Sequence, residues 1–240
     1  MGVTIAYRGQ LDDRASLPKL TADIQGACRE LGWSCKDVET LVREGTDGCA
    51  GLSGVSLQTH PRCEWLHLHF DADGHLTNHF YWALLSDSDY AARVSAMLSE
   101  NQRALRQLMG GERAERQKEH SGGTLVDVVE VDPSSLDLAQ GVRYNWVKTQ
   151  YAGSAAHVGV CGVLRHLKER YASGLIVDDD SGYFEHRNLA NLERALAEVE
   201  VLVHRVTREV RSIPSGSVQT PRDLIERLKR ALVRPKDDLH

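Results

Sequence analysis

Side chains that can bind a metal ion are concentrated in one stretch of the chain: His60, Cys63, His67, His69, His75 and His79. Residues two apart on a β-strand point to the same side, so His67 and His69 can share one ion. His60 and Asp179 are the further ligands that we select, with His157 as an alternative. A catalytic zinc ion takes three protein ligands and a water molecule. This set of residues therefore predicts a metal-dependent hydrolase.

The same histidines have a simpler interpretation. The sequence contains no H-E-x-x-H or C-x-x-C pattern that would define a ligand geometry. Histidines on a strand face beside Trp65 are also typical of amphipathic surface or half-buried packing. The sequence leaves both interpretations open.

A second candidate site, for an anion, lies in the segment that precedes a predicted helix. Lys148 and Gln150 come before Ser154, which we expect to cap that helix, and His157 follows one turn later. Free N–H groups and the helix dipole favour an anion at such an end. Lys148, Gln150 and His157 are therefore candidate ligands of a phosphate or carboxylate. In the alternative interpretation Thr149 and Gln150 end a strand and Lys148 is a solvated charge.

The apolar pattern predicts the elements that would position these residues. Strands are expected at 3–11, 34–42, 55–57, 64–70, 75–82, 125–131, 144–147 and 175–177, and helices at 14–31, 88–109 and 154–172. Asp73-Gly74 between two alternating runs predicts a hairpin, which requires antiparallel pairing. The expected fold class is α+β, with an antiparallel sheet backed by helices over residues 1–187 and a helical insertion near 86–118.

The clearest periodic pattern is a heptad seam in the last quarter of the chain. Its apolar residues alternate at spacings of three and four: Leu189, Leu192, Leu196, Val199, Val203, Val206, Val210 and Ile213. So narrow a stripe on a long helix requires a partner helix. A second helix is expected after Pro214, so residues 188–240 form a two-helix arm. The arm either packs on itself or joins a helix of another chain.

Several short motifs resemble a known group of sequences. These motifs resemble the landmarks of an uncharacterised family of bacterial proteins. They are H-P-x-C-E at 60–64, F-D-x-D-G at 70–74 and K-T-Q-Y-A-G at 148–153, followed by His157, Asp178-Asp179, Tyr183 and Glu185. The resemblance covers residues 55–80 and 145–187. It implies a bacterial source and no known reaction, and it assigns no site.

Composition excludes some classes of function. The formal net charge of -5 over 240 residues argues against a nonspecific nucleic-acid binder. No apolar run is long enough to cross a membrane, and the first residues lack the pattern of a signal peptide. Five cysteines without a C-x-x-C pair suit a reducing compartment, which predicts a cytoplasmic protein. Neither glycine pattern of nucleotide-binding loops occurs, so a nucleotide is not expected. The expectation is that the protein has no cofactor, with a divalent metal ion as the alternative.

These observations lead to two expected functions. The preferred one is a noncatalytic bacterial cytosolic interaction protein, which self-associates or docks a protein partner through its C-terminal helices. The alternative is the metal-dependent hydrolase that uses the histidine-rich strand. Neither nucleic acid nor membrane is expected as a partner.

Overall fold

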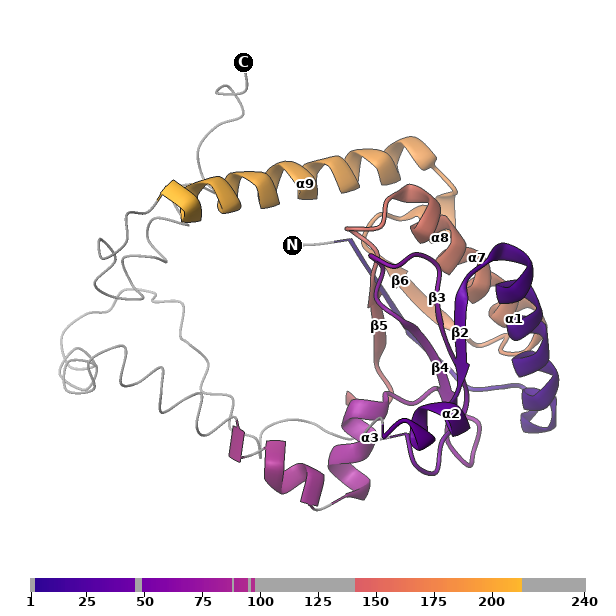
Figure 1. Ribbon diagram of the computed structural model, residues 1–240. Coiled ribbons are helices and arrows are strands. Elements are labelled where there is room, and N and C mark those ends of the chain that lie inside the picture. The colour runs from indigo at the N-terminus through magenta and orange to yellow at the C-terminus, as the bar shows by residue number, and fades with distance from the viewer. Residues whose placement is uncertain (1–2, 46–48, 88, 95, 98–140, 213–240) are drawn as a thin grey trace, which may run out of the picture. The chain divides into compact units, whose positions relative to one another are not determined.

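The computed structural model describes residues 3–45, 49–87, 89–94, 96–97 and 141–212 (Figure 1). The chain divides into two units. The first unit consists of Met1–Ala91 and Leu136–Val199 and contains every strand described here. The second unit consists of Ala92–Ser135 and Glu200–His240. Three predicted features lie largely or wholly outside the described residues: most of the helical insertion near 86–118, the strand at 125–131 and the second helix of the arm.

Two three-stranded antiparallel sheets form the centre of the first unit. In one, β1 (Thr4–Arg8) lies between β5 (Asn145–Lys148) and β6 (Ile176–Asp179). In the other, β3 (Ser53–Gln58) lies between β2 (Ser34–Asp37) and β4 (Leu66–Phe70). The predicted α+β class and antiparallel pairing are confirmed, although the strands form two sheets and not one.

A hydroxyl group connects these two sheets. The Tyr7 hydroxyl on β1 donates to the carbonyl of His67 on β4 at 2.8 Å and accepts from the backbone N–H of His67 at 3.2 Å. Tyr7 is only 1% exposed, so both bonds lie in the core. The backbone of His67 is thereby held to a strand of the other sheet.

Two long helices pack on the same core as the strands (Figure 1). Helix α1 (Leu17–Leu31) follows the short 3-10 helix η1 (Arg14–Ser16), buries Leu20 and Ile24, and ends at Gly32, whose φ of 67° is left-handed. Helix α7 (Ser154–Arg170) buries an apolar side that includes Val160, Leu164 and Leu167. The helices predicted at 14–31 and 154–172 are therefore confirmed.

The prediction of a second hairpin strand at 75–82 is wrong. His75 and Leu76 form only isolated bridges, to Gln10 and Phe70, and helix α3 (His79–Ser86) replaces the strand expected at 75–82. The cause is Asn78, whose side-chain oxygen accepts from the N–H groups of Phe80 at 3.1 Å and Tyr81 at 3.5 Å. This cap supplies partners to N–H groups that a helix start leaves free, and the aromatic run that resembled a strand becomes helical.

Two other predicted boundaries require the same kind of correction. The strand expected at 34–42 stops at Asp37, whose carboxylate accepts from the N–H of Thr40 at 2.7 Å and begins helix α2 (Val38–Arg43). Ser154 was expected to cap α7, but the cap position is Gly153, with φ 82° and no side-chain bond. A short polar side chain identifies a helix start only when its oxygen faces the free N–H groups.

The C-terminal part of the first unit leads into the long predicted helix. Helix α8 (Tyr183–His186) is a single turn after β6, and α9 (Leu189–Ser212) follows with the expected apolar spacing. Of the helices that the structure describes, none combines the length and the apolar character needed to cross a membrane.

Candidate functional site

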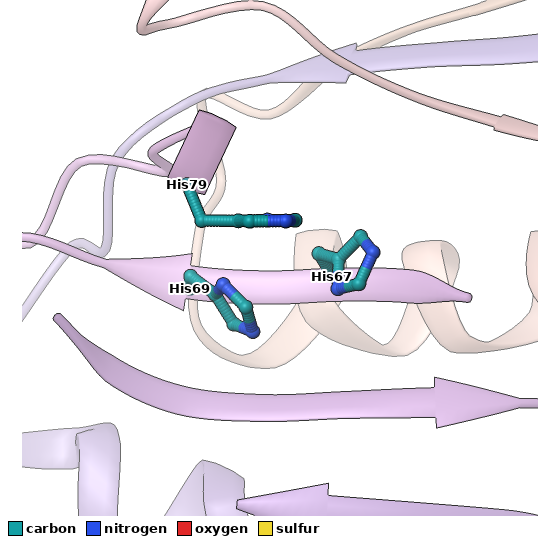
Figure 2. A group of neighbouring side chains, drawn as sticks. All are labelled: His67, His69 and His79. Atoms are coloured by element: carbon teal, nitrogen blue, oxygen red, sulfur yellow. The ribbon is translucent and has the colours of Figure 1, made fainter. Parts of the chain in front are cut away.

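Three histidine side chains meet beside β4 (Figure 2). His67 and His69 project from the same side of β4, and His79 approaches from the first turn of α3. The ring centroids of His67 and His79 lie 4.6 Å apart, those of His67 and His69 5.1 Å, and those of His69 and His79 5.4 Å. One ring nitrogen of each lies within 4.8 Å of one from each of the others.

Ser56 holds two of these rings in position. It lies on β3 directly opposite His67 in the strand register, with His69 on the diagonal. Its Oγ is 2.7 Å from Nδ1 of His67 and 2.8 Å from Nε2 of His69. A hydroxyl group has one proton, so at least one of the two rings must donate to this oxygen. The hydroxyl therefore limits both ring rotation and the tautomers available.

Burial keeps the three rings neutral at physiological pH. Burial and the neighbouring His79 lower the pKa of His67 from 6.5 to about 3. Burial, followed by the charges of the two neighbouring rings, lowers the pKa of His69 well below its usual value. Burial also lowers the pKa of His79. Neutral imidazole is the form that binds metal ions.

One buried ring nitrogen in this group has no hydrogen-bond partner among the described residues. Nδ1 of His69 is buried and, within the described part of the chain, makes no hydrogen bond, while the side chain as a whole is 0% exposed. An unpaired polar atom in such a place is unfavourable by about 1–3 kcal/mol. A bound ion would require ligand nitrogens about 3.3 Å apart in a tetrahedral zinc site. The three ring nitrogens, which lie within 4.8 Å of one another, would therefore have to move closer together to bind an ion.

The structure alters the predicted ligand set. His67 and His69 lie together as expected, but His79 provides the third nitrogen, and neither His60 nor Asp179 belongs to this group. His60 is exposed, and its Nδ1 accepts from the N–H of Arg62 at 3.1 Å. His79 was among the histidines noted in the sequence, but the expected strand at 75–82 concealed its position. Ser56 had no signal in the sequence, because strand register decides what it faces.

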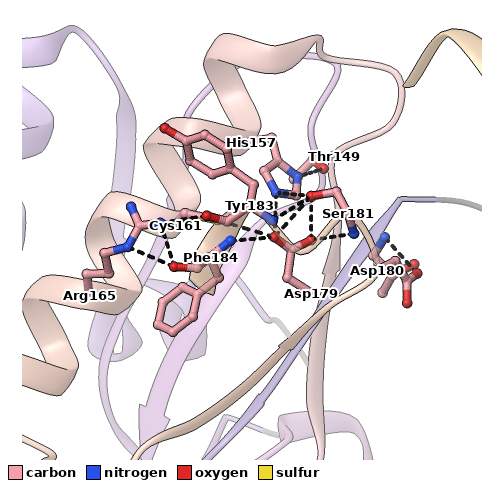
Figure 3. A network of polar contacts seen from close by, with 10 residues as sticks. Thr149, His157, Cys161, Arg165, Asp179, Asp180, Ser181, Tyr183 and Phe184 are labelled. Carbon is pink, nitrogen blue, oxygen red and sulfur yellow. Dashed lines mark hydrogen bonds and ion pairs between the residues drawn. The ribbon is translucent and has the colours of Figure 1, made fainter. Parts of the chain in front are cut away.

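Asp179 belongs to a different cluster, at the ends of β5 and β6 (Figure 3). His157 lies between Thr149 and Asp179: its Nδ1 is 2.8 Å from the Thr149 hydroxyl, and its Nε2 is 3.1 Å from the Asp179 carboxylate. Ser181 donates from its N–H at 2.9 Å and from its hydroxyl at 2.8 Å to the same carboxylate. The order hydroxyl, imidazole, carboxylate resembles that of a hydrolase triad.

Burial argues against catalysis at this second cluster. The side chains of His157 and Asp179 are both 0% exposed, and Thr149 is 0% exposed, so a substrate cannot reach the hydroxyl. Cys161 lies 4.0 Å from the carboxylate, and burial, reinforced by that charge, raises its pKa to about 12. A thiol with so high a pKa is a poor nucleophile. The cluster acts as a structural connection between two strand ends and α7.

The predicted anion site is not assembled by the described residues. The ring of His157 is committed to Thr149 and Asp179, and a carboxylate beside it repels an anion. The backbone N–H of Lys148 donates to a carboxylate oxygen of Glu64 at 2.9 Å. Gln150 has a buried Oε1 with no hydrogen-bond partner among the described residues, but that atom is an acceptor and cannot bind an anion. The structural interpretation of this segment is the better one.

The apolar side chains of the heptad seam differ in their exposure to solvent. Leu192 is 0% exposed, whereas Leu189 is 46% and Val203 is 37% exposed. Leu196, Val199 and Val206 are intermediate. The side chain of Val210 and all of Ile213 lie outside the described residues.

A third group contains Asp71, Asp73 and His75, whose ligand atoms also lie within 4.8 Å of one another. Asp71 is already occupied, because it accepts from Arg143 at 2.5 Å and from the N–H groups of Asp73 at 2.9 Å and His75 at 3.0 Å. This group forms the turn after β4.

No family model, curated protein or solved structure was found to match the chain.

Proposed function

We propose that the protein binds a divalent transition-metal ion, with zinc as the first choice, through His67, His69 and His79. The observation that carries the proposal is that three neutral imidazoles meet, and that one of them, His69, has a buried Nδ1 without a hydrogen-bond partner among the described residues. Imidazole nitrogens suit zinc, copper and nickel, whereas calcium and magnesium prefer oxygen ligands.

This ligand set also supports hydrolysis as the chemistry. Three histidines leave a fourth position for water in a tetrahedral site, and a bound zinc ion lowers the pKa of that water to about 7. His67 and His79 are only partly buried, so one side of the group is open to solvent. Ser56 would then hold the ligating rings from behind, as outer hydrogen-bond partners do at zinc sites.

Zinc titration of the full chain tests the proposal. Calorimetry should show one zinc ion bound per chain, and the ion should raise the melting temperature because it binds only the folded state. His79→Ala should weaken binding at least tenfold. His60→Ala is the matched control, since His60 is an exposed histidine outside the group, and it should bind zinc like the parent.

Two outcomes would overturn the metal site. One is the absence of zinc-dependent heat in the parent. The other is equal zinc binding by the parent, His67→Ala and His79→Ala, with each variant shown to be folded by circular dichroism. His79 is partly exposed on a helix, so its replacement leaves the core intact if His67→Ala does not fold.

A second candidate is the association function predicted from the heptad seam. We propose that α9 self-associates or docks a protein partner, independently of the metal site. Its support is the exposure of two seam residues of this amphipathic helix, Leu189 at 46% and Val203 at 37%. Apolar side chains in series on a helix are typical of partner contacts.

A further inference from the structure

The sheet that contains β5, β1 and β6 has one buried face and one face open to solvent. Ile5 on the middle strand β1 and Val147 on β5 are both 0% exposed. Side chains alternate across a strand, so Trp146 on β5 lies on the other face, and the same alternation places Ile176 of β6 there. These two apolar side chains are 38% and 53% exposed.

Trp146 belongs to a patch of aromatic side chains at the β5 side of this open face. The centroid of its ring system lies 6.3 Å from that of Tyr144 and 6.5 Å from that of Tyr81 on α3. Tyr144 is 44% exposed, and Tyr81 is partly exposed. Neighbouring exposed aromatic side chains are typical of a contact surface.

The strand register separates the charges of the open face by sign. Lys148 on β5 pairs with Thr4 on β1, and the carbonyl of Thr4 accepts from the N–H of Asp180 at 3.1 Å. Lys148 and Asp180 therefore lie in one row, on opposite sides of β1. In the row below, Trp146 and Asp178 lie on opposite sides of Ala6. The base and both acids are exposed, so the β5 side is basic and aromatic and the β6 side is acidic.

We propose that this open face is the contact surface of a symmetric dimer, in which it packs on the same face of a second copy of the chain. The inference uses neither the metal ligands nor α9. A twofold axis parallel to β1 places each β5 over the β6 of the other copy, and each row of residues then faces the same row.

This arrangement brings opposite charges together. Lys148 of each copy faces Asp180 of the other. Trp146 faces Asp178 in the same way, and the indole N–H is a donor that a carboxylate can accept. At the centre Ala6 faces its own copy, and its small side chain lets the two sheets approach each other.

Charge also decides against the other symmetric arrangement. A twofold axis across the strands would place Asp178 against its own copy, and like charges at an interface are unfavourable. In the arrangement that we propose, the like-charged pair is Arg8 with its own copy. Arg8 is exposed at the end of β1, so both guanidinium groups lie at the rim and remain in water.

The size of the face indicates a weak dimer. Three strands about 4.8 Å apart, with rows about 3.3 Å apart along them, give a face of roughly 15 by 16 Å. This is well below the about 800 Å² per partner of a standard interface. The dissociation constant should therefore lie in the micromolar range or above.

Exchange of charge between Lys148 and Asp180 tests the inference. Sedimentation equilibrium of the full chain should show a monomer–dimer equilibrium. Lys148→Glu alone and Asp180→Lys alone each place like charges opposite one another and should weaken association at least tenfold. An equimolar mixture of the two variants should associate like the parent, because both contacts of the mixed dimer then join opposite charges.

The control is Glu30→Lys, an exposed position on α1 that changes the net charge by the same amount as Asp180→Lys. It should associate like the parent. All chains carry Val199→Asp and Val206→Asp as well, so that association through α9 does not contribute, and circular dichroism checks that each is folded.

Three outcomes in this background would overturn the inference. One is a parent that remains monomeric at millimolar concentration. Another is association of Lys148→Glu and Asp180→Lys, each alone, as tight as that of the parent. The third is a mixture of the two variants that associates no more tightly than either variant alone.

Discussion

Asp179→Asn should destabilise the first unit by removing a buried charge that four donors hold. The carboxylate accepts from the N–H of Ser181 at 2.9 Å, its hydroxyl at 2.8 Å, the N–H of Phe184 at 2.9 Å and the ring of His157 at 3.1 Å. Burial, the largest single influence, raises the pKa of Asp179, but His157 and the backbone donors together outweigh it. The pKa falls from 3.8 to about 2.

The magnitude follows from this shift. At 1.36 kcal/mol for each pKa unit, the ionised carboxylate contributes about 2 kcal/mol to the free energy of unfolding at pH 7. In the variant, the NH₂ group of asparagine also faces N–H and O–H donors that the carboxylate had accepted. This increases the loss of unfolding free energy by a further amount of about 1–2 kcal/mol. The expected loss is therefore about 3–4 kcal/mol. Urea denaturation measures it. Asp180→Asn is the control, because Asp180 is exposed and, among the described residues, its side chain accepts only the N–H of Thr4. This variant should lose less than about 1 kcal/mol.

The dependence on pH gives an independent check of the sign. Because folding lowers the pKa of Asp179, its stabilisation is complete above the unfolded value of 3.8 and disappears as the pH falls towards 2. The parent should lose about 2 kcal/mol more than Asp179→Asn between pH 5 and pH 2. Identical pH dependence in the two proteins would refute the reasoning, since the carboxylate would then have the same pKa in both states.

Two further predictions concern helices. Asn78→Ala should lower the free energy of unfolding by about 1–2 kcal/mol, because it removes the cap of α3. Ser154→Ala should change that free energy by less than about 0.5 kcal/mol. Denaturant titration of both variants measures the difference, and equal losses would contradict the cap assignment. Replacing Val199 and Val206 of α9 by Asp should lower the molecular mass measured by light scattering if the helix self-associates. Circular dichroism checks that the variant is folded. An unchanged mass would exclude self-association through α9.

The sequence predicted the helices with strong periodicity better than the segments with short polar signals. Helices α1, α7 and α9 each have apolar residues recurring over more than three turns, and only one periodicity fits so long a run. The segment 75–82 is short and rich in aromatic residues, which favours a strand on propensity alone. The Asn78 cap outweighed that preference. A cap signal depends on which N–H groups the side chain faces, and spacing does not contain that information.

The candidate site was predictable in part for a related reason. The placement of His67 and His69 on one side of a strand follows from backbone alternation, which is a local property. The third ring, His79, and the hydroxyl of Ser56 reach the group through the start of α3 and the register of β3 with β4. Both are properties of the fold. Residue type alone suggests His60 and Asp179 as ligands, but the fold places both of them away from the three rings.

The two histidine clusters show why residue type alone does not identify a site. His157 and His69 are both 0% exposed, and each contacts a hydroxyl group. His157 uses both nitrogens, one for Thr149 and one for Asp179, so a ligand would have to break bonds that already stabilise the fold. His69 uses one nitrogen and leaves the other without a partner among the described residues, beside two further neutral rings. A metal ion bound at that nitrogen would relieve the unfavourable burial. For this reason we propose the group of His67, His69 and His79, and not the triad-like cluster, as the metal site.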